Sequence, residues 1–232
     1  MIKFLSKPTF LTLLVCCLTL FAKAQIGYNY AKVDLGIGFT SNQVFGDVAK
    51  KTTTQSFGGS LTYHISPFFN IVSETQFGSL AGGNQYSDPN RRQFKGNFFS
   101  TQLREQLQVG ELIDYSDNNF YNAIKNFYSS VGVGVLVNHV TSITRPVGSE
   151  LGTNNTNIVF IPFKVGYEFK IFNDYDQPYI KIDLGVQLNA MLSDNLDGYT
   201  YGSTNDFLIQ ETLGIKFAIG AGNTSYRKQV SY

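Results

Sequence analysis

The chain has 232 residues, with 18 Lys+Arg against 17 Asp+Glu, so its formal net charge is +1 at neutral pH. This balance lacks the basic excess that a nucleic-acid-binding surface requires, and we expect no nucleic-acid partner. The only two cysteines lie within the first 24 residues, which we expect to be cleaved off, so no disulfide framework and no cysteine-based metal site should remain. Composition therefore excludes these classes of function and leaves the pattern along the chain to be interpreted.

Residues 1–24 have the parts of a secretory signal peptide. Lys3 and Lys7 form its positively charged region, and residues 10–21 form its apolar region. The apolar run, about twelve residues long, is too short to span a bilayer as a helix. We therefore expect this segment to direct export and to be removed.

The cleavage site is the A-x-A motif Ala22-Lys23-Ala24, which makes Gln25 the first mature residue. Cleavage would remove Cys16 and Cys17, and lipidation of either is disfavoured because apolar sequence continues beyond them. It would also remove three lysines and no acid, so the formal charge becomes 15 − 17 = −2. The remaining segment, 25–232, has a length that fits a single domain.

Beyond the leader, apolar residues alternate with polar residues or glycine in eight segments. Ile180, Ile182 and Leu184 show the alternation most clearly, because each is followed by a polar residue or glycine. Period-2 alternation places the two sets on opposite faces of a strand. A tilted strand of roughly 9–11 residues crosses a membrane. The eight expected strands are 30–40, 55–65, 69–79, 97–109, 128–139, 157–171, 178–192 and 206–219.

The connections between these strands alternate in length. Long polar links are expected at 41–54, 80–96, 140–156 and 193–205, whereas Ser66-Pro67-Phe68 and 173–177 are short. Bacterial outer-membrane barrels have long extracellular loops, short periplasmic turns and an even number of strands. The pattern predicts an all-β protein, an eight-stranded antiparallel up-and-down transmembrane β-barrel. One short helix, around Phe120 to Phe127, is expected in a long periplasmic turn.

The alternation alone does not decide which face points outward, because secreted lipocalin-type barrels have eight strands with apolar residues inside. Ionised residues and glycines share the polar face, and both suit the narrow lumen of an eight-stranded barrel. Aromatic residues also fall where strands should meet the membrane interfaces. The outer set is Phe39, Phe57, Phe77, Phe99 and Phe207, and the periplasmic set is Tyr63, Phe69, Tyr128, Tyr167, Phe169 and Phe217. We therefore expect an apolar outer face and a polar lumen.

At this point the chain resembles the small outer-membrane barrels of Gram-negative bacteria, the OmpA-type transmembrane domain and OmpX-like proteins. The resemblance rests on the leader, the eight strands and the loop parity. The last strand also fits their assembly signal, polar-x-Gly-x-x-hydrophobic-x-hydrophobic, through Thr212, Gly214, Phe217 and Ile219. It implies an integral protein of the outer membrane that contacts outer-membrane lipid and the barrel-assembly machinery. The chain continues about a dozen residues past the signal and lacks the peptidoglycan-binding domain of full-length OmpA-type proteins.

The charged residues of the polar face form one dense constellation. An ion in a narrow, poorly hydrated lumen is costly unless it is paired, so acids and bases should form a salt-bridged plug. Glu74 is expected to meet Arg104, and Asp183, Lys216 and Asp34 are expected to lie together. The alternative is a solute path through the same residues. The lumen set is Lys32, Asp34, Glu74, Arg104, Lys164, Glu168, Lys181, Asp183 and Lys216.

His64, Ser66 and Glu74 invite comparison with the His-x-Ser pair and Glu of lipid A deacylases. Their expected position near the periplasmic turn is at the wrong face for lipid A, and a nucleophile needs its base within hydrogen-bond reach. We expect no catalytic residue, no cofactor and no metal site.

Three residues fit the barrel poorly. Glu105 and Glu211 fall on the lipid face, where a charge costs free energy. A β-bulge that shifts the phase, or a protein partner, would accommodate them. Pro162 lacks a ladder donor, and a bulge is expected there too.

The outer loops could bind a ligand or partner, because loops held on a rigid scaffold often carry function. The candidates are Asp88, Arg91, Arg92, Glu150 and Tyr199 to Tyr201. We expect a non-enzymatic barrel with a structural or surface-interaction role and an unidentified surface or periplasmic partner. A small-solute channel is the alternative, and a lipid-modifying enzyme is third.

Overall fold

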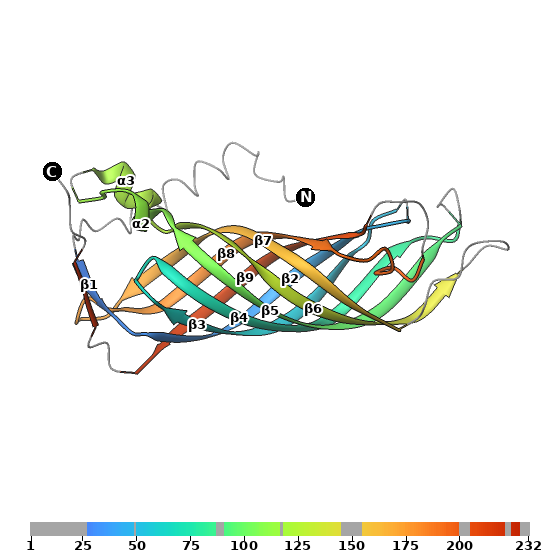
Figure 1. The fold of residues 1–232 in the computed structure, drawn as a ribbon, viewed down its shortest axis with the longest axis horizontal. Helices are drawn as coiled ribbons and strands as arrows, with labels where there is room; N and C mark the ends of the chain where they lie inside the picture. The colour runs from blue at the N-terminus through green and yellow to red at the C-terminus, as the bar shows by residue number, and fades with distance from the viewer. Residues whose placement is uncertain are drawn as a thin grey trace, which may run out of the picture.

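The computed structural model describes residues 27–48, 50–86, 91–116, 118–144, 155–199, 205–220 and 224–227. Eight consecutive strands form a closed antiparallel barrel, which confirms the expected fold class (Figure 1). Each strand pairs with the next, and the last pairs with the first. Closure leaves no strand edge open to lipid, where unpaired backbone groups are costly. The barrel strands are β2 (Val33–Phe45), β3 (Thr53–His64), β4 (Phe69–Gly83), β5 (Gln93–Gln108), β6 (Phe127–Thr144), β7 (Asn155–Phe172), β8 (Pro178–Met191) and β9 (Phe207–Ile219).

The strands are strongly staggered around the barrel. A row of directly paired residues that starts at Tyr128 on β6 returns to β6 at Asn138, ten residues further along. Stagger, strand number and tilt are linked, so the strands cross the membrane obliquely. The complete row is Tyr128, Gly166, Gly185, Thr212, Thr40, Ser56, Gly78, Phe98 and Asn138.

The outer face of the barrel is apolar, and this excludes the lipocalin-type alternative. Val133, Val135 and Leu184 are exposed on the outside, whereas Lys181 and Asp183 are buried in the lumen.

The expected outer aromatic set does not lie at one level, because Phe39 is the fifth and Phe99 the eighth residue in the nine-residue paired row from Phe127 to Val137. Among the expected periplasmic positions, Tyr128 is wrong. Its side chain is buried in the lumen, because it has the inward parity of its strand.

At the outer end of the barrel, the polarity of the two faces is reversed. Val44, Leu80, Phe98 and Leu208 point inward and belong to one buried apolar cluster. At the same end, outward positions such as Lys95 are polar. The barrel thus continues past its lipid-facing belt as a water-exposed β-barrel with an apolar core. The whole cluster is Val44, Val48, Leu80, Phe94, Phe98, Leu136, Val140, Ile158, Phe160, Met191, Leu196, Tyr199 and Leu208.

This reversal explains why several strands extend further at their outer ends than expected. The pattern predicts that long links start at residues 41, 80 and 140, but β2, β4 and β6 continue to Phe45, Gly83 and Thr144. The polar residues there are outward positions of a continuing strand. At the membrane boundary the apolar residues switch from the outward to the inward face of each strand. The alternating sequence pattern is interrupted there, although the strand itself continues.

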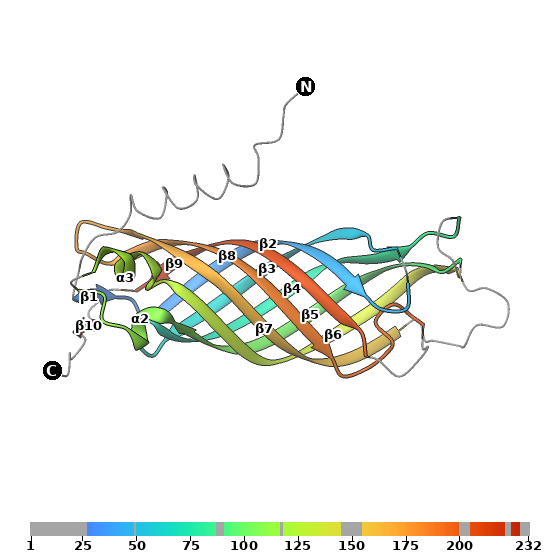
Figure 2. The ribbon, with the colours of Figure 1, turned by 90° about the horizontal axis from the view of Figure 1, so that it is seen from above.

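The periplasmic end carries additional small elements (Figure 2). Two short helices, α2 (Val109–Leu112) and α3 (Asn119–Ile124), replace the single expected helix, and Asn118 caps α3 through its side chain. The segment beyond the barrel forms β10 (Thr224–Arg227), which pairs with β1 (Gly27–Tyr30). A small apolar cluster that includes Phe68 packs beside them. None of the helices in the described part of the chain is long and apolar enough to span a membrane.

The prediction of a bulge at Pro162 is wrong. Phe163 pairs with Val131 and Phe160 pairs with Gly134 in one unchanged register, although the two pairs between them are missing from the β6–β7 ladder. The missing donor of the proline is therefore accommodated by a gap in the ladder rather than by an inserted residue.

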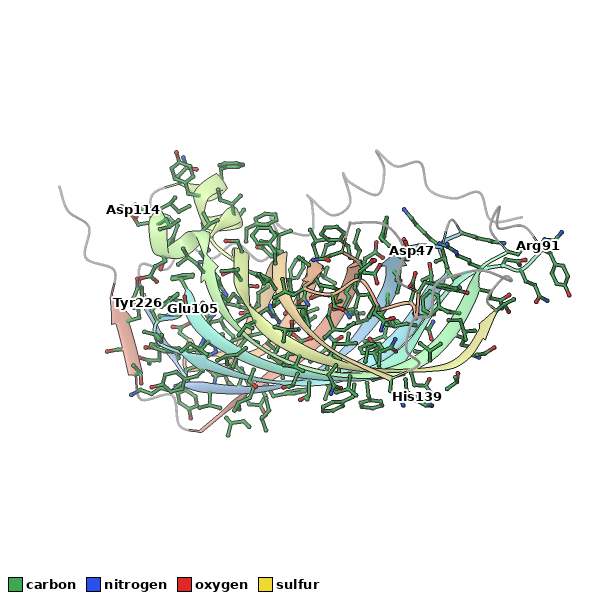
Figure 3. The ribbon with its side chains drawn as sticks, turned by 45° about the vertical axis from the view of Figure 1, so that its right-hand side comes forward. Asp47, Arg91, Glu105, Asp114, His139 and Tyr226 are labelled. Atoms are coloured by element: carbon green, nitrogen blue, oxygen red, sulfur yellow. The ribbon has the colours of Figure 1, made fainter. Side chains whose placement is uncertain are left out.

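No bulge accommodates the two outward glutamates either. Glu105 and Glu211 both pair with their neighbouring strands in regular register. Glu105 lies near the end of the barrel that carries Asp114 and Tyr226, opposite the end with Asp47 and Arg91 (Figure 3). Its carboxylate can reach the headgroup region of that interface. Glu211 has no such explanation.

Candidate functional site in the barrel lumen

The first cluster of lumen charges is centred on Glu74 of β4 and Arg104 of β5. Arg104 donates to the Glu74 carboxylate through Nη2, and through Nη1 to Ser130 Oγ at 2.9 Å. Gln76 also donates to Glu74. The Arg104 side chain is only 1% exposed, so this pair is separated from bulk water. Arg104 and Glu74 therefore meet as the strand assignments predict.

The second cluster is centred on Asp183 of β8. It accepts from Tyr128 Oη at 2.5 Å and lies 3.0 Å from Lys216 Nζ and 3.5 Å from Lys164 Nζ. Lys216 also donates to Glu168 at 3.0 Å. Each acid of this cluster therefore has a cation within ion-pair distance, which offsets its desolvation.

Glycines make room for the tyrosine in this cluster. Gly166 and Gly185 follow Tyr128 in the row of directly paired residues described above. A Cβ atom would lie 2.6 Å from Tyr128 Oη if added to Gly166, and 2.7 Å from it if added to Gly185. Their small size lets the tyrosine ring lie across the neighbouring strands and reach Asp183.

The third cluster lies nearest the periplasmic end and is centred on Asp34 of β2. Lys181 Nζ donates to Asp34 at 2.5 Å, and His64 Nε2 contacts the same oxygen at 2.7 Å. His64 Nδ1 contacts the Asn70 side chain. The strand assignments place Asp34 beside Lys216. Lys216 lies on the adjacent strand β9, but its ammonium group pairs with Asp183 and Glu168, and Asp34 pairs with Lys181 of β8 instead.

The structure corrects the lumen set at its edges. Lys32 is wrong: it precedes β2, is exposed, and its backbone carbonyl accepts from His64 N. Sequence reasoning missed Lys170, which is buried and donates to Gln108 Oε1 at 2.7 Å and to Pro67 O at 3.1 Å. The parity that Lys170 shares with the lumen residues of its strand was a signal that could have identified it.

Above the charged clusters, the lumen is filled by side-chain amides. Gln187 Nε2 donates to Gln102 at 3.0 Å and to Gln210 at 3.2 Å, and Gln210 donates to Asn42 and Gln76 at 2.8 Å. All five are buried. The apolar core lies beyond them. The lumen therefore has three successive layers: ions, then amides, then hydrocarbon.

Little free space remains among the charged residues. A cavity of about 20 Å³ is bounded by Glu74, Arg104, Lys164, Asp183 and Lys216, together with neighbouring glycines and threonines. This is enough for about one water molecule.

The described residues of the link between β8 and β9 pack into the outer mouth of the barrel. Leu196 and Tyr199 insert into the apolar core, and Tyr199 Oη donates to Thr144 O at 2.5 Å and accepts from Gln93 N at 3.1 Å. The Arg92 guanidinium lies 5.4 Å from the Tyr199 ring. Arg92 and Tyr199, two of the loop residues predicted to bind a ligand or partner, thus contact each other and link the strands at the outer mouth.

Of the remaining loop residues predicted to bind a ligand or partner, only Arg91 belongs to the described residues. Arg91 is described at the same end of the barrel as Asp47 (Figure 3). Several predicted residues lie outside the described ones: Asp88, Glu150, Thr200 and Tyr201 of the loops, and the cleavage residues Ala22, Ala24 and Gln25.

The His/Ser/acid arrangement of a hydrolase is not formed. His64 contacts Asp34, Ser66 Oγ donates to Glu111 at 2.5 Å, and Glu74 is paired with Arg104. Because the three groups have separate partners, they do not form the relay of nucleophile, base and orienting acid that such an enzyme requires.

Two buried aspartates of the outer mouth, beyond the lipid-facing belt, make its stability depend on pH. Burial, with repulsion from Asp197, raises the pKa of Asp206 to about 8, from an ordinary value of 3.8. The folded protein then keeps a proton that the unfolded chain releases, so the mouth should gain stability as pH falls from about 8 toward 4.

Proteolysis of intact cells across this pH range measures the effect. Asp206→Asn should flatten the dependence, since the amide oxygen can still accept from Leu196 N, which Asp206 binds at 2.8 Å. Asp174→Asn, at an exposed periplasmic turn, is the matched control and should leave the dependence unchanged. Equal slopes for the parent and Asp206→Asn would contradict the assignment.

These features define a class of protein: a closed, eight-stranded barrel of the outer-membrane type, with an apolar belt and a filled lumen. No known protein-family model matches the chain, and its sequence matches no curated protein. Among solved structures it is similar in fold to Neisserial surface protein A, with a TM-score of 0.50 and 11% identity over 82% of this chain and 98% of that one. Ail, the attachment invasion locus protein of Yersinia pestis, gives a TM-score of 0.46 and 10% identity over 81% and 98%. OprG of Pseudomonas aeruginosa gives 0.42 and 9% over 88% and 99%.

Proposed function

We propose that this protein is a non-conducting, non-enzymatic barrel of the outer membrane with a structural or surface-interaction role. The observation that carries the proposal is the filled lumen. Ion pairs, an amide layer and an apolar core succeed one another along its length, and the described cavity among the charges holds about 20 Å³. Such a lumen is a plug.

The outer half of the barrel supports a role at the cell surface. β6 and β7 each have 18 residues, whereas roughly 9–11 tilted residues are enough to cross the membrane. The additional residues form the water-exposed extension with its own apolar core. A rigid extension of this kind holds the connecting loops away from the membrane, where they can meet a partner.

The leader and the assembly signal complete the proposal. Residues 1–24 would direct export and be removed after Ala24. Thr212, Gly214, Phe217 and Ile219 would be recognised by the barrel-assembly machinery. They belong to β9, the strand that closes the barrel against β2, with Phe217 and Ile219 facing outward.

Planar-bilayer recording separates the plug from the small-solute channel. We expect no steady single-channel currents from the purified protein, because the described lumen side chains are buried and bonded to one another in successive layers. A porin inserted from the same detergent is the control for insertion. Uniform, steady current steps would contradict the plug and favour the channel. Lipid A mass spectra that differ between expressing and non-expressing cells would instead favour the enzyme.

A further inference from the structure

We propose that the outer face formed by β9, β2 and β3 is an interface between two copies of this chain in the membrane. The proposal starts from Glu211, whose side chain is exposed on the outside of β9. No hydrogen bond or ion pair from the described residues reaches its carboxylate. An acidic group on the membrane-facing surface therefore lacks a partner within its own barrel.

The depth of Glu211 follows from the stagger of the strands. Its neighbour Thr212 is the fourth of nine residues in the row that rises from Tyr128 to Asn138. The outward positions of β6, which are apolar except for Ser129, span the same height, from residue 127 to residue 137. Glu211 thus lies near mid-height in the belt.

A carboxylate at this depth requires a hydrogen-bond donor, and hydrocarbon chains provide none. Ionisable groups within a membrane are rare and typically mark functional contacts. The other outward glutamate, Glu105, lies near the periplasmic headgroups and needs no such contact. Glu211 therefore needs a hydrogen-bond donor that a protein partner on the lipid-facing surface would supply.

The residues beside Glu211 identify that partner as a second copy. Across the strands, Ser41 pairs with Glu211 on one side and with Gln55 on the other. One face thus presents an acceptor, a hydroxyl and an amide donor in a row. A two-fold axis beside Ser41 turns Glu211 of each copy toward Gln55 of the other, so the patch is complementary to itself. The three residues include no cation that would repel a second copy.

The apolar surface next to this row is also shaped for packing against protein. Phe39, Phe57 and Phe77 surround a hollow of about 600 Å³ above Gly59. All three rings are exposed, with Phe77 at 62%. Protruding rings beside a hollow on one face can interlock with the same face of a second copy.

A second hollow, of about 680 Å³, is lined by Glu211 and Ser41 themselves and extends across β8 to Phe169 of β7. The Glu211 row therefore borders this hollow directly and lies beside the first one. Farther round the barrel, the outward positions of β6 and β7 at 127–137 and 159–171 carry no charged side chain. The proposal accordingly concerns the side that carries Glu211.

Cysteine crosslinking in membranes tests the proposal, because Cys16 and Cys17 are the only cysteines of the chain and the parent reports any background from them. Ser41→Cys should form a covalent dimer on oxidation. Val135→Cys, which is exposed on the outer face of β6, is the matched control and should form little.

Substitution of Glu211 then tests the chemistry. Glu211→Gln keeps a hydrogen-bonding group and should retain the dimer. Glu211→Leu removes two symmetric interchain hydrogen bonds, each corresponding to about a three- to thirty-fold change in a membrane, so the dimer dissociation constant should rise by about ten-fold to several hundred-fold. Equal crosslinking at residues 41 and 135, or a crosslinked product of a different mass than two chains, would overturn the proposal. So would a monomer by light scattering whose fraction does not change with protein concentration.

Discussion

Arg104→Met alone should lower the stability of the barrel by about 3–5 kcal/mol, the cost of breaking one side of a buried ion pair. The substitution leaves the Glu74 carboxylate in the lumen with Gln76 but without the guanidinium that neutralises it. Outer-membrane barrels keep their fold in gels unless heated, so the temperature at which the heat-modifiable mobility is lost measures the effect. Glu105→Gln changes the adjacent, outward residue of the same strand and should have little effect.

The double variant Glu74→Gln/Arg104→Met should recover much of the loss, because it removes both charges together. The coupling energy follows from a double-mutant cycle. Strictly additive losses would show that the two side chains do not interact. Small losses from both single variants would indicate a hydrated lumen, and would move the channel ahead of the plug.

Phe94→Ala should destabilise the water-exposed extension by about 3–5 kcal/mol, because it removes a buried ring and leaves a cavity. Phe94 is 1% exposed and packs in the apolar core with Val48 and Leu80. The charged and amide layers lie below it and should remain folded. We therefore expect faster proteolysis of the extension in intact cells, with a much smaller change in the heat-modifiable mobility.

Phe99→Ala is the matched control on the same strand. Phe99 faces outward and is 51% exposed, so its removal empties no core. If Phe94→Ala and Phe99→Ala gave equal proteolysis, the outer core would not be what holds the extension. If Phe94→Ala abolished the heat-modifiable form altogether, the extension and the membrane half would unfold as one unit.

The sequence by itself determined the eight strands and the faces of the membrane half, because alternation is local. Lys181 and Asp183 each have apolar neighbours that point to the opposite face of the strand. Their place in the lumen therefore follows from the local sequence, without knowledge of contacts to other strands. The same parity placed Glu211 outside. Parity also indicates Tyr128 and Lys170 as lumen residues, although the ring of Tyr128 fits the aromatic pattern of an interface equally well.

Tertiary structure alone decided what depends on register and on the position of the membrane. Asp34 meets Lys181 instead of Lys216 because the Lys216 ammonium group pairs with Asp183 and Glu168, a choice that depends on contacts between strands far apart in the sequence. Lys32 has the parity of the lumen but lies just before β2, where the wall has ended.

The apolar core of the extension was hidden from the sequence for a similar reason. Val44 and Leu80 continue the inward parity of their strands, but alternation carries no mark of where lipid gives way to water. Pairing across the barrel supplies that information, because it brings these side chains together into a core that neither strand could form alone.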